Sequence, residues 1–172
     1  MSIDQEVFYA IHGLAGDSTW LDFLGIFFAK YLPYFIVVGF FIALLFIPNW
    51  RRRLYQFFLA ALSVLLTRGL ILEVIRFIYY RPRPDLVLSI DTLIETPALS
   101  SFPSGHATVF FALGTAVWFL NKKWGLFLII GATLISIARV FVGVHWPLDI
   151  VAGGLIGFLG AQIVKHTLPK VK

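Results

Sequence analysis

Long runs of apolar residues are the feature that most constrains the fold of this chain. Five of them are long enough, or nearly so, to cross a bilayer, which takes about 20 helical residues: 31–47, 54–75, 104–120, 124–142 and 147–164. A lipid-exposed backbone must satisfy its own hydrogen bonds, and a helix does so within one segment. We therefore predict an all-α, polytopic membrane helix bundle that forms a single domain over residues 1–172.

The composition agrees and excludes several classes of site. Hydrophobic residues make up 59% of the chain and charged residues only 13%, against about a quarter charged in soluble domains. The chain has no cysteine, which excludes disulfides, thiolate metal sites and a cysteine-nucleophile phosphatase.

The first 30 residues give a weaker pattern. The segment DQEVFYAIHGL (4–14) has one apolar and one polar face, and STWLDFLGIFF (18–28) is too short to span a bilayer alone. We predict that both are interfacial helices on the outer side, with the N-terminus outside. This gives five transmembrane helices, and a sixth span through the N-terminal residues is the alternative.

Basic clusters predict the orientation. If the helices alternate, three clusters fall on the same side of the membrane: Arg51–Arg53, Lys122–Lys123, and Lys165 with Lys170 and Lys172. The positive-inside rule makes that side cytoplasmic, so we predict a bacterial cytoplasmic membrane protein with a cytoplasmic C-terminus. These clusters account for the net charge of +5 without a nucleic-acid partner. In the last apolar stretch, Gly153 and Gly157 form a GxxxG step, with Gly160 one turn on, which predicts close helix packing.

Arginines on the opposite side break this charge rule. Five of them fall in outer loops or outer helix ends: Arg68, Arg76, Arg81, Arg83 and Arg139. Any one of them could snorkel to lipid headgroups or pair with Asp85, Asp91 or Glu95. Several guanidinium groups together with two histidines favour a phosphate site, because a guanidinium binds phosphate with paired hydrogen bonds.

Two short polar segments accompany these arginines. Ser104, Gly105 and His106 open an apolar helix on the outer side, where unpaired N–H groups favour an anion. Ser104 alone is more typical of an ordinary N-cap. His145 and Asp149 stand four residues apart across Pro147, so a carboxylate can hold one ring nitrogen and raise the basicity of the other. A satisfied structural pair is the alternative.

Together these segments read RFIYYRPRP (76–84), PSGH (103–106) and RVFVGVHWPLD (139–149). They closely resemble the three-part signature of the type-2 phosphatidic acid phosphatase superfamily: Lys-x6-Arg-Pro, Pro-Ser-Gly-His and Ser-Arg-x5-His-x3-Asp. Arg76 replaces the lysine and Ala138 replaces the serine. The segment AIHGLAGDSTWLD (10–22) is also similar to bacterial undecaprenyl-diphosphate phosphatases of this superfamily.

The resemblance implies a set of roles. His145 would attack phosphorus and form a phosphohistidine, Asp149 would orient it, and His106 would protonate the leaving oxygen and then activate water. The phosphoryl oxygens would be held by Arg76, Arg83, Ser104, Gly105 and Arg139. No metal and no other cofactor is implied.

Further roles are predicted for three more residues. Arg81 and Arg68 are additional to the signature and could hold a second phosphate. Arg68 and Glu73 could instead support the site from behind or form a buried ion pair, which we favour for these two.

The predicted function is a membrane lipid phosphatase acting at the outer leaflet, with undecaprenyl diphosphate as the favoured substrate. Lipid A 1-phosphate, phosphatidylglycerol phosphate and phosphatidate remain alternatives. Two other classes are a vanadium haloperoxidase, against which the apolar spans argue, and a non-catalytic lipid transporter or scaffold, against which the intact His106, His145 and Asp149 argue. The oligomeric state stays open.

Overall fold

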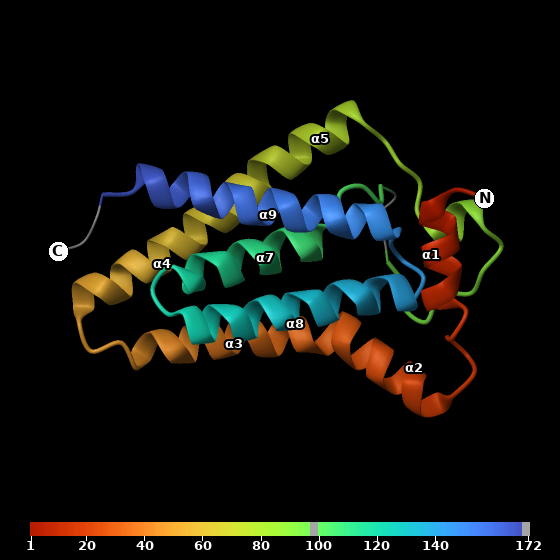
Figure 1. Cartoon of the computed structure of the whole chain (residues 1–172), viewed down its shortest axis with the longest axis horizontal. Coiled ribbons are helices and arrows are strands. Elements are labelled where there is room, and N and C mark those ends of the chain that lie inside the picture. The colour runs from red at the N-terminus through yellow and green to blue at the C-terminus, as the bar shows by residue number, and fades with distance from the viewer. Residues whose placement is uncertain (97–99, 170–172) are drawn as a thin grey trace.

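The computed structural model describes residues 1–96 and 100–169, which fold into helices running back and forth between two ends of a bundle (Figure 1). The elements are α1 (Ile3–His12), α2 (Thr19–Ile26), η1 (Phe27–Tyr31), α3 (Leu32–Leu45), α4 (Trp50–Val64), η2 (Leu65–Ile71), α5 (Leu72–Ile78), α6 (Pro84–Val87), α7 (Gly105–Trp118), α8 (Lys122–Phe141) and α9 (Pro147–Thr167). The predicted all-α helix bundle is confirmed.

Two of the long helices contain a π-helical segment. α2, η1 and α3 form one continuous helix of 27 residues, Thr19–Leu45, and α4, η2 and α5 form one of 29 residues, Trp50–Ile78. η1 ends two residues before Pro33, whose ring would clash with the carbonyl group four residues earlier in a regular α-helix. The prediction of a separate interfacial helix at 18–28 is therefore wrong in one respect, because these residues continue into α3.

α1 is a separate helix that lies across one end of the bundle (Figure 1). Its apolar face is held by Phe8, which is fully buried with its ring centroid 5.1 Å from that of Trp146. The Nδ1 atom of His12 lies 2.8 Å from the carbonyl oxygen of Phe141. α1 is thus fixed to the turn between α8 and α9, and its location at a membrane surface stays a prediction.

Among the described residues, four helices are long and apolar enough to cross a membrane: Thr19–Leu45, Trp50–Ile78, Lys122–Phe141 and Pro147–Thr167. The remaining predicted span, 104–120, is a helix of only 14 residues, Gly105–Trp118. At 1.5 Å per residue it is about 21 Å long, less than the thickness of a bilayer core, ~30 Å. In Figure 1, α7 begins deeper in the bundle than the ends of α8 and α9. A cavity lined by Gly105 and His106 lies at the start of α7, and we refer to it as the recess.

α7 is the most buried of the long helices and packs against α4, α8 and α9. The close helix packing predicted at Gly153 and Gly157 of α9 is present, and the partner helix is α7. A Cβ atom at Gly153 would lie 2.6 Å from the carbonyl oxygen of Ser104, and one at Gly157 would lie 2.4 Å from that of Thr108. Both distances are too short for any side chain, so the two backbones touch directly.

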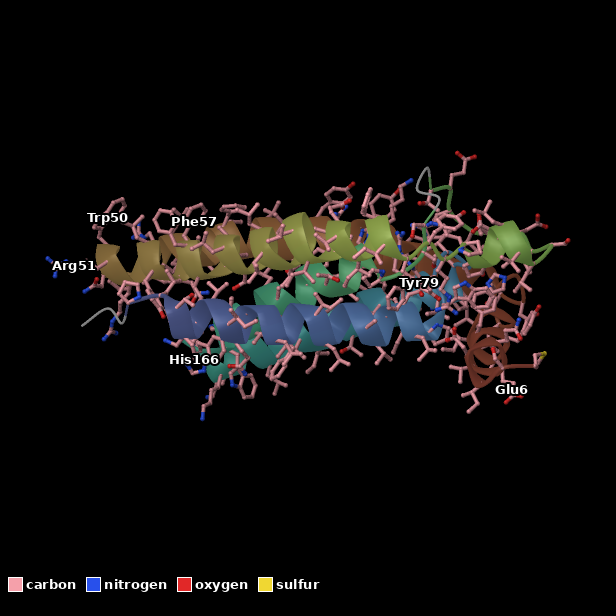
Figure 2. All side chains as sticks on the ribbon, turned by 90° about the horizontal axis from the view of Figure 1, so that it is seen from above. Glu6, Trp50, Arg51, Phe57, Tyr79 and His166 are labelled. Carbon is pink, nitrogen blue, oxygen red and sulfur yellow. The ribbon has the colours of Figure 1, made fainter. Side chains whose placement is uncertain are left out.

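The basic clusters lie at one end of the bundle and the recess lies at the other. Figure 2 shows Trp50, Arg51 and His166 at the first end, with Tyr79 and Glu6 at the second. Two members of the last cluster, Lys170 and Lys172, lie outside the described residues.

The glycine contact predicts the effect of a single methyl group. Gly157→Ala is expected to lower the free energy of unfolding by about 1–3 kcal/mol, the usual cost of overpacking. Gly39→Ala is the matched control, because a Cβ there meets nothing within 4 Å; its effect is expected to be neutral, or stabilising by up to about 1 kcal/mol. Thermal unfolding in one detergent compares them, and equal midpoints for the two variants would contradict the packing.

Candidate active site

The recess above α7 is a cavity of about 1000 Å³ at the α1 end of the bundle. It collects side chains from parts of the chain that are far apart in sequence. Of the predicted site residues, those that line it are Arg68, Arg76, Arg83, Gly105, His106, Arg139 and His145. The three sequence motifs therefore meet at one cavity. Their spacing in the sequence alone could not show this.

His145 and Asp149 form the back of the cavity. Pro147 begins α9, and Asp149 in its first turn accepts a hydrogen bond from the Trp146 N–H at 2.9 Å. The His145 Nδ1 atom lies 3.5 Å from Asp149 Oδ2, so the other ring nitrogen, Nε2, is the one left to face the cavity. The His145–Asp149 pair predicted from the spacing is present.

Ser101 belongs to this pair, although the sequence reasoning missed it. Its hydroxyl group is fully buried, donates to Asp149 Oδ2, and lies 3.3 Å from His145 Nδ1. The only sequence signal is its place two residues before the PSGH motif.

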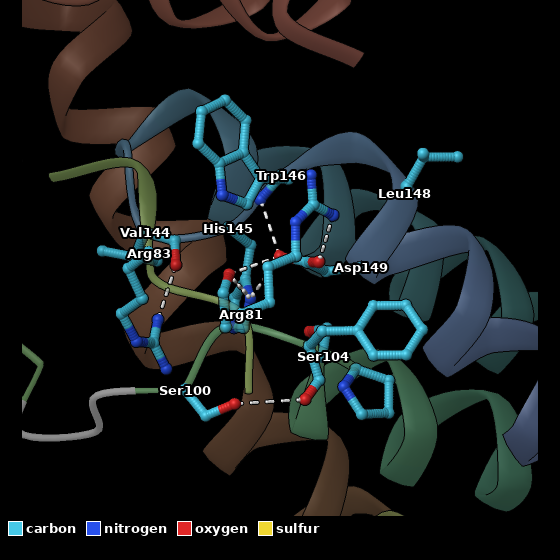
Figure 3. A network of polar contacts seen from close by, with 12 residues as sticks. Arg81, Arg83, Ser100, Ser104, Val144, His145, Trp146, Leu148 and Asp149 are labelled. Carbon is cyan, nitrogen blue, oxygen red and sulfur yellow. Dashed lines mark hydrogen bonds and ion pairs between the residues drawn. The ribbon is translucent and has the colours of Figure 1, made fainter. Parts of the chain in front are cut away.

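Arg81 contacts Asp149 (Figure 3) and does not line the cavity. Its guanidinium group donates to Asp149 Oδ1 at 2.7 Å and also binds Asp4 of α1. The Asp4 carboxylate, itself buried, accepts a hydrogen bond from the Leu148 N–H at 2.9 Å. The geometry favours a supporting role for Arg81 over the second-phosphate role that the sequence analysis predicted. Asp4 was missed, because the helix pattern placed it on a polar, exposed face.

Burial sets the protonation of His145. The imidazole is only 1% exposed, and this burial lowers the pKa of His145 to about 4; Asp149 opposes the shift, while Arg83 adds to it. The ring is therefore neutral at neutral pH, with a lone pair available on the nitrogen that faces the cavity.

The arginines of the motifs offer donors to an anion. Arg76 donates to the carbonyl oxygen of Pro103 at 3.1 Å, and Arg83 donates to that of Val144 at 2.5 Å, which orients both guanidinium groups. The Nε atoms of Arg76 and Arg139 are buried and have no hydrogen-bond partner among the described residues. Leaving buried donors unpaired is costly, and both arginines line the cavity with other parts of their side chains.

Ser104 differs from its predicted role. It is fully buried and does not line the cavity, and its hydroxyl group accepts from the Ala107 N–H at 3.4 Å as the N-cap of α7. The alternative interpretation, an ordinary cap, describes it better. Gly105 does line the cavity, and a Cβ there would lie 3.1 Å from Arg68 Nε, so its missing side chain lets the arginine approach the start of α7.

Arg68 and Glu73 form the ion pair that the sequence reasoning favoured, but it is not buried. Their side chains are 40% and 55% exposed. Arg68 lines the cavity whereas Glu73 does not. Lys30 and Tyr34 of the helix Thr19–Leu45 also line the cavity, and the sequence analysis assigned them no role.

Metal ligands do not gather at this site. Within residues 1–96 and 100–169, no group of three or more histidine, aspartate or glutamate side chains is placed to hold a metal ion. The positive charge around the cavity comes from arginine and lysine side chains.

Comparisons with known proteins agree with these motifs. The chain is 31% identical over 169 residues to the "Bacitracin transport permease protein BcrC" of Bacillus licheniformis, covering 98% of this chain and 82% of the relative. It is 32% identical to the "Undecaprenyl-diphosphatase BcrC" of Bacillus subtilis, covering 91% and 82%. A shorter match is the "Lipid A 1-phosphatase" of Rhizobium etli, 33% identical over 52% of this chain and 40% of the relative.

The chain shares its fold with a solved structure, and its sequence matches a family model. The crystal structure of Aquifex aeolicus LpxE superposes with a TM-score of 0.78 at 27% identity, covering 96% of both chains. The family model of the PAP2 superfamily matches residues 57–172, about two thirds of the chain, and includes all three motifs. The resemblance stated from the motifs is therefore confirmed: the chain belongs to the PAP2 superfamily and is a membrane phosphatase of that family.

Proposed function

We propose that this phosphatase hydrolyses undecaprenyl diphosphate to the monophosphate at the outer leaflet of the bacterial cytoplasmic membrane. The observation that carries the proposal is the cavity itself. The cavity is lined on one part by the neutral His145 and by arginines with buried donors, and on another part by apolar side chains. A phosphate and a lipid chain can therefore occupy it together. The similarity to an undecaprenyl-diphosphatase over most of both chains supports the choice of lipid.

In the proposed reaction, Nε2 of His145 attacks the terminal phosphorus. A P–N bond forms while the P–O bond to the lipid phosphate breaks, and the electron pair leaves on that oxygen. Asp149 stabilises the positive charge that develops on the ring, and Arg76, Arg83 and Arg139 hold the equatorial oxygens. His106 donates a proton to the leaving oxygen when the substrate requires one.

The second step returns the enzyme to its starting state. His106 takes a proton from water, whose oxygen attacks the phosphohistidine. The P–N bond breaks, inorganic phosphate leaves, and His145 is again neutral. His106 returns to its starting protonation state by exchanging its proton with the surrounding water. The enzyme's positive charges provide the transition-state stabilisation that metal ions provide in other phosphatases.

The substrate prediction is tested with purified protein and a panel of lipids in one detergent, with EDTA present. Undecaprenyl diphosphate is expected to have a higher kcat/KM than lipid A, phosphatidylglycerol phosphate or phosphatidate, since that ratio measures discrimination. The substitution His145→Ala is expected to lower kcat/KM by a factor of roughly 10⁴ or more. Preference for lipid A would replace the proposed substrate, and full activity of His145→Ala would exclude the proposed nucleophile.

A supporting role for Arg81 makes a distinct prediction. Arg81→Met is expected to lower kcat by about 10- to 100-fold, the usual loss when a group that orients an active-site residue is removed. KM is expected to stay near the wild-type value because Arg81 touches Asp149 and not the cavity. Steady-state kinetics separate the two constants; a raised KM with unchanged kcat would instead mean that Arg81 binds substrate directly.

The orientation is tested by cysteine labelling in intact cells, for which the cysteine-free chain is a clean background. Cysteines replacing Arg52 and Lys122 are expected to be protected from a membrane-impermeant reagent, because the positive-inside rule places both on the cytoplasmic side. A cysteine replacing Asp91, in the segment before α7, is expected to react. The reverse pattern would place the active site in the cytoplasm.

A further inference from the structure

We propose that Lys30 and Arg68 form a second anion subsite, which binds the lipid-side phosphate of a diphosphate while the motif residues hold the phosphate that is cleaved. The inference rests on the function proposed above. It adds the residues that distinguish a diphosphate from a monophosphate, and it assigns a role to Lys30, which lies outside the three motifs.

Both cations line the same cavity as His145 but come from the two helices that contain π-helical segments. Lys30 belongs to η1 and Arg68 belongs to η2. A π-helical turn carries an extra residue, which turns the side chains on either side relative to a regular α-helix, and such turns are frequent at functional sites. In each helix, the irregular turn holds a basic side chain that reaches the cavity.

Lys30 stands at an unusual place for a lysine. It is the only basic residue between Thr19 and Leu45, a helix long and apolar enough to cross a membrane. It lies well inside that helix rather than at either end. Ionisable side chains inside such spans are costly and usually face a cavity where they serve a function.

The two cations keep donors for a ligand. In the described part of the chain, Lys30 makes no ion pair, and its Nζ atom lies over the ring of the neighbouring Tyr31, 5.7 Å from the centroid. Arg68 pairs with Glu73, but both side chains are about half exposed, so this pair contributes little and can yield to a phosphate. The approach of Arg68 Nε to Gly105 places the guanidinium group beside the motif site.

The apolar wall indicates which phosphate would meet Lys30. Cavity residues of its helix recur at intervals of three or four, which defines one helix face: Ile26, Ala29, Lys30, Pro33, Tyr34 and Val37. Lys30 lies in the middle of this largely apolar face. A lipid chain packed along it would bring the phosphate attached to the chain next to the ammonium group, and the terminal phosphate would extend to His145.

This placement has a chemical consequence. When the terminal phosphoryl group transfers to His145, the bond to the bridging oxygen breaks and that oxygen keeps the electron pair. The leaving group is then a lipid monophosphate with an additional negative charge, which Lys30 and Arg68 would neutralise. A monophosphate ester has no phosphate at this position, so it gains less from the two cations.

The test compares farnesyl diphosphate with farnesyl monophosphate, which share one chain and differ by one phosphate, using the full-length protein in detergent. Lys30→Met is expected to lower the kcat/KM ratio of diphosphate to monophosphate by about 10- to 100-fold, the size of a lost charged hydrogen bond. Lys30→Arg is expected to keep most of the ratio. Lys123→Met is the matched control, since Lys123 is exposed at the opposite end of the bundle.

An unchanged ratio in Lys30→Met would overturn the inference, whether the variant keeps its activity on both substrates or loses the same share of activity on both. The wild-type protein tests the proposed function separately. If the wild-type protein fails to hydrolyse the diphosphate, the proposed function fails, and this inference fails with it. If the wild-type protein hydrolyses the diphosphate and Lys30→Met behaves as wild type, only the inference fails.

Discussion

The Asp149 carboxylate is the group on which the arrangement of the site depends. It accepts from the Ser101 hydroxyl, from the Trp146 backbone and from Arg81, and it lies beside His145. A fully buried carboxylate is stable only when its oxygens are satisfied in this way. The same contacts join the segment before α7, the start of α9 and the loop after α5, so the charge that orients the proposed nucleophile also holds these segments together.

α1 takes part in this network from outside the motifs. Asp4 binds Arg81 and caps the start of α9 through Leu148, while Phe8 packs on Trp146. The N-terminal helix thereby closes the site on the side away from the cavity. Its Asp4 contact helps to keep Arg81 directed at Asp149.

The depth of the site follows from the short α7. Because α7 begins within the bundle, its first turn, with His106, lies at the bottom of a cavity whose other walls are longer helices. Lipid can be in contact with the apolar wall while arginines surround its phosphate. Close packing at Gly153 and Gly157 supports this arrangement, since it sets α7 directly against α9.

The sequence by itself determined the helical class and the three motifs, because apolar run length and motif spacing are local properties of the chain. Only the tertiary structure showed that Ser104 is a cap, that Arg81 faces Asp149, and that Ser101, Asp4 and Lys30 reach the site. Each of these depends on which way a side chain points once distant helices pack. That direction comes from long-range contacts and from irregular turns such as η1, for which a single sequence carries no periodic signal.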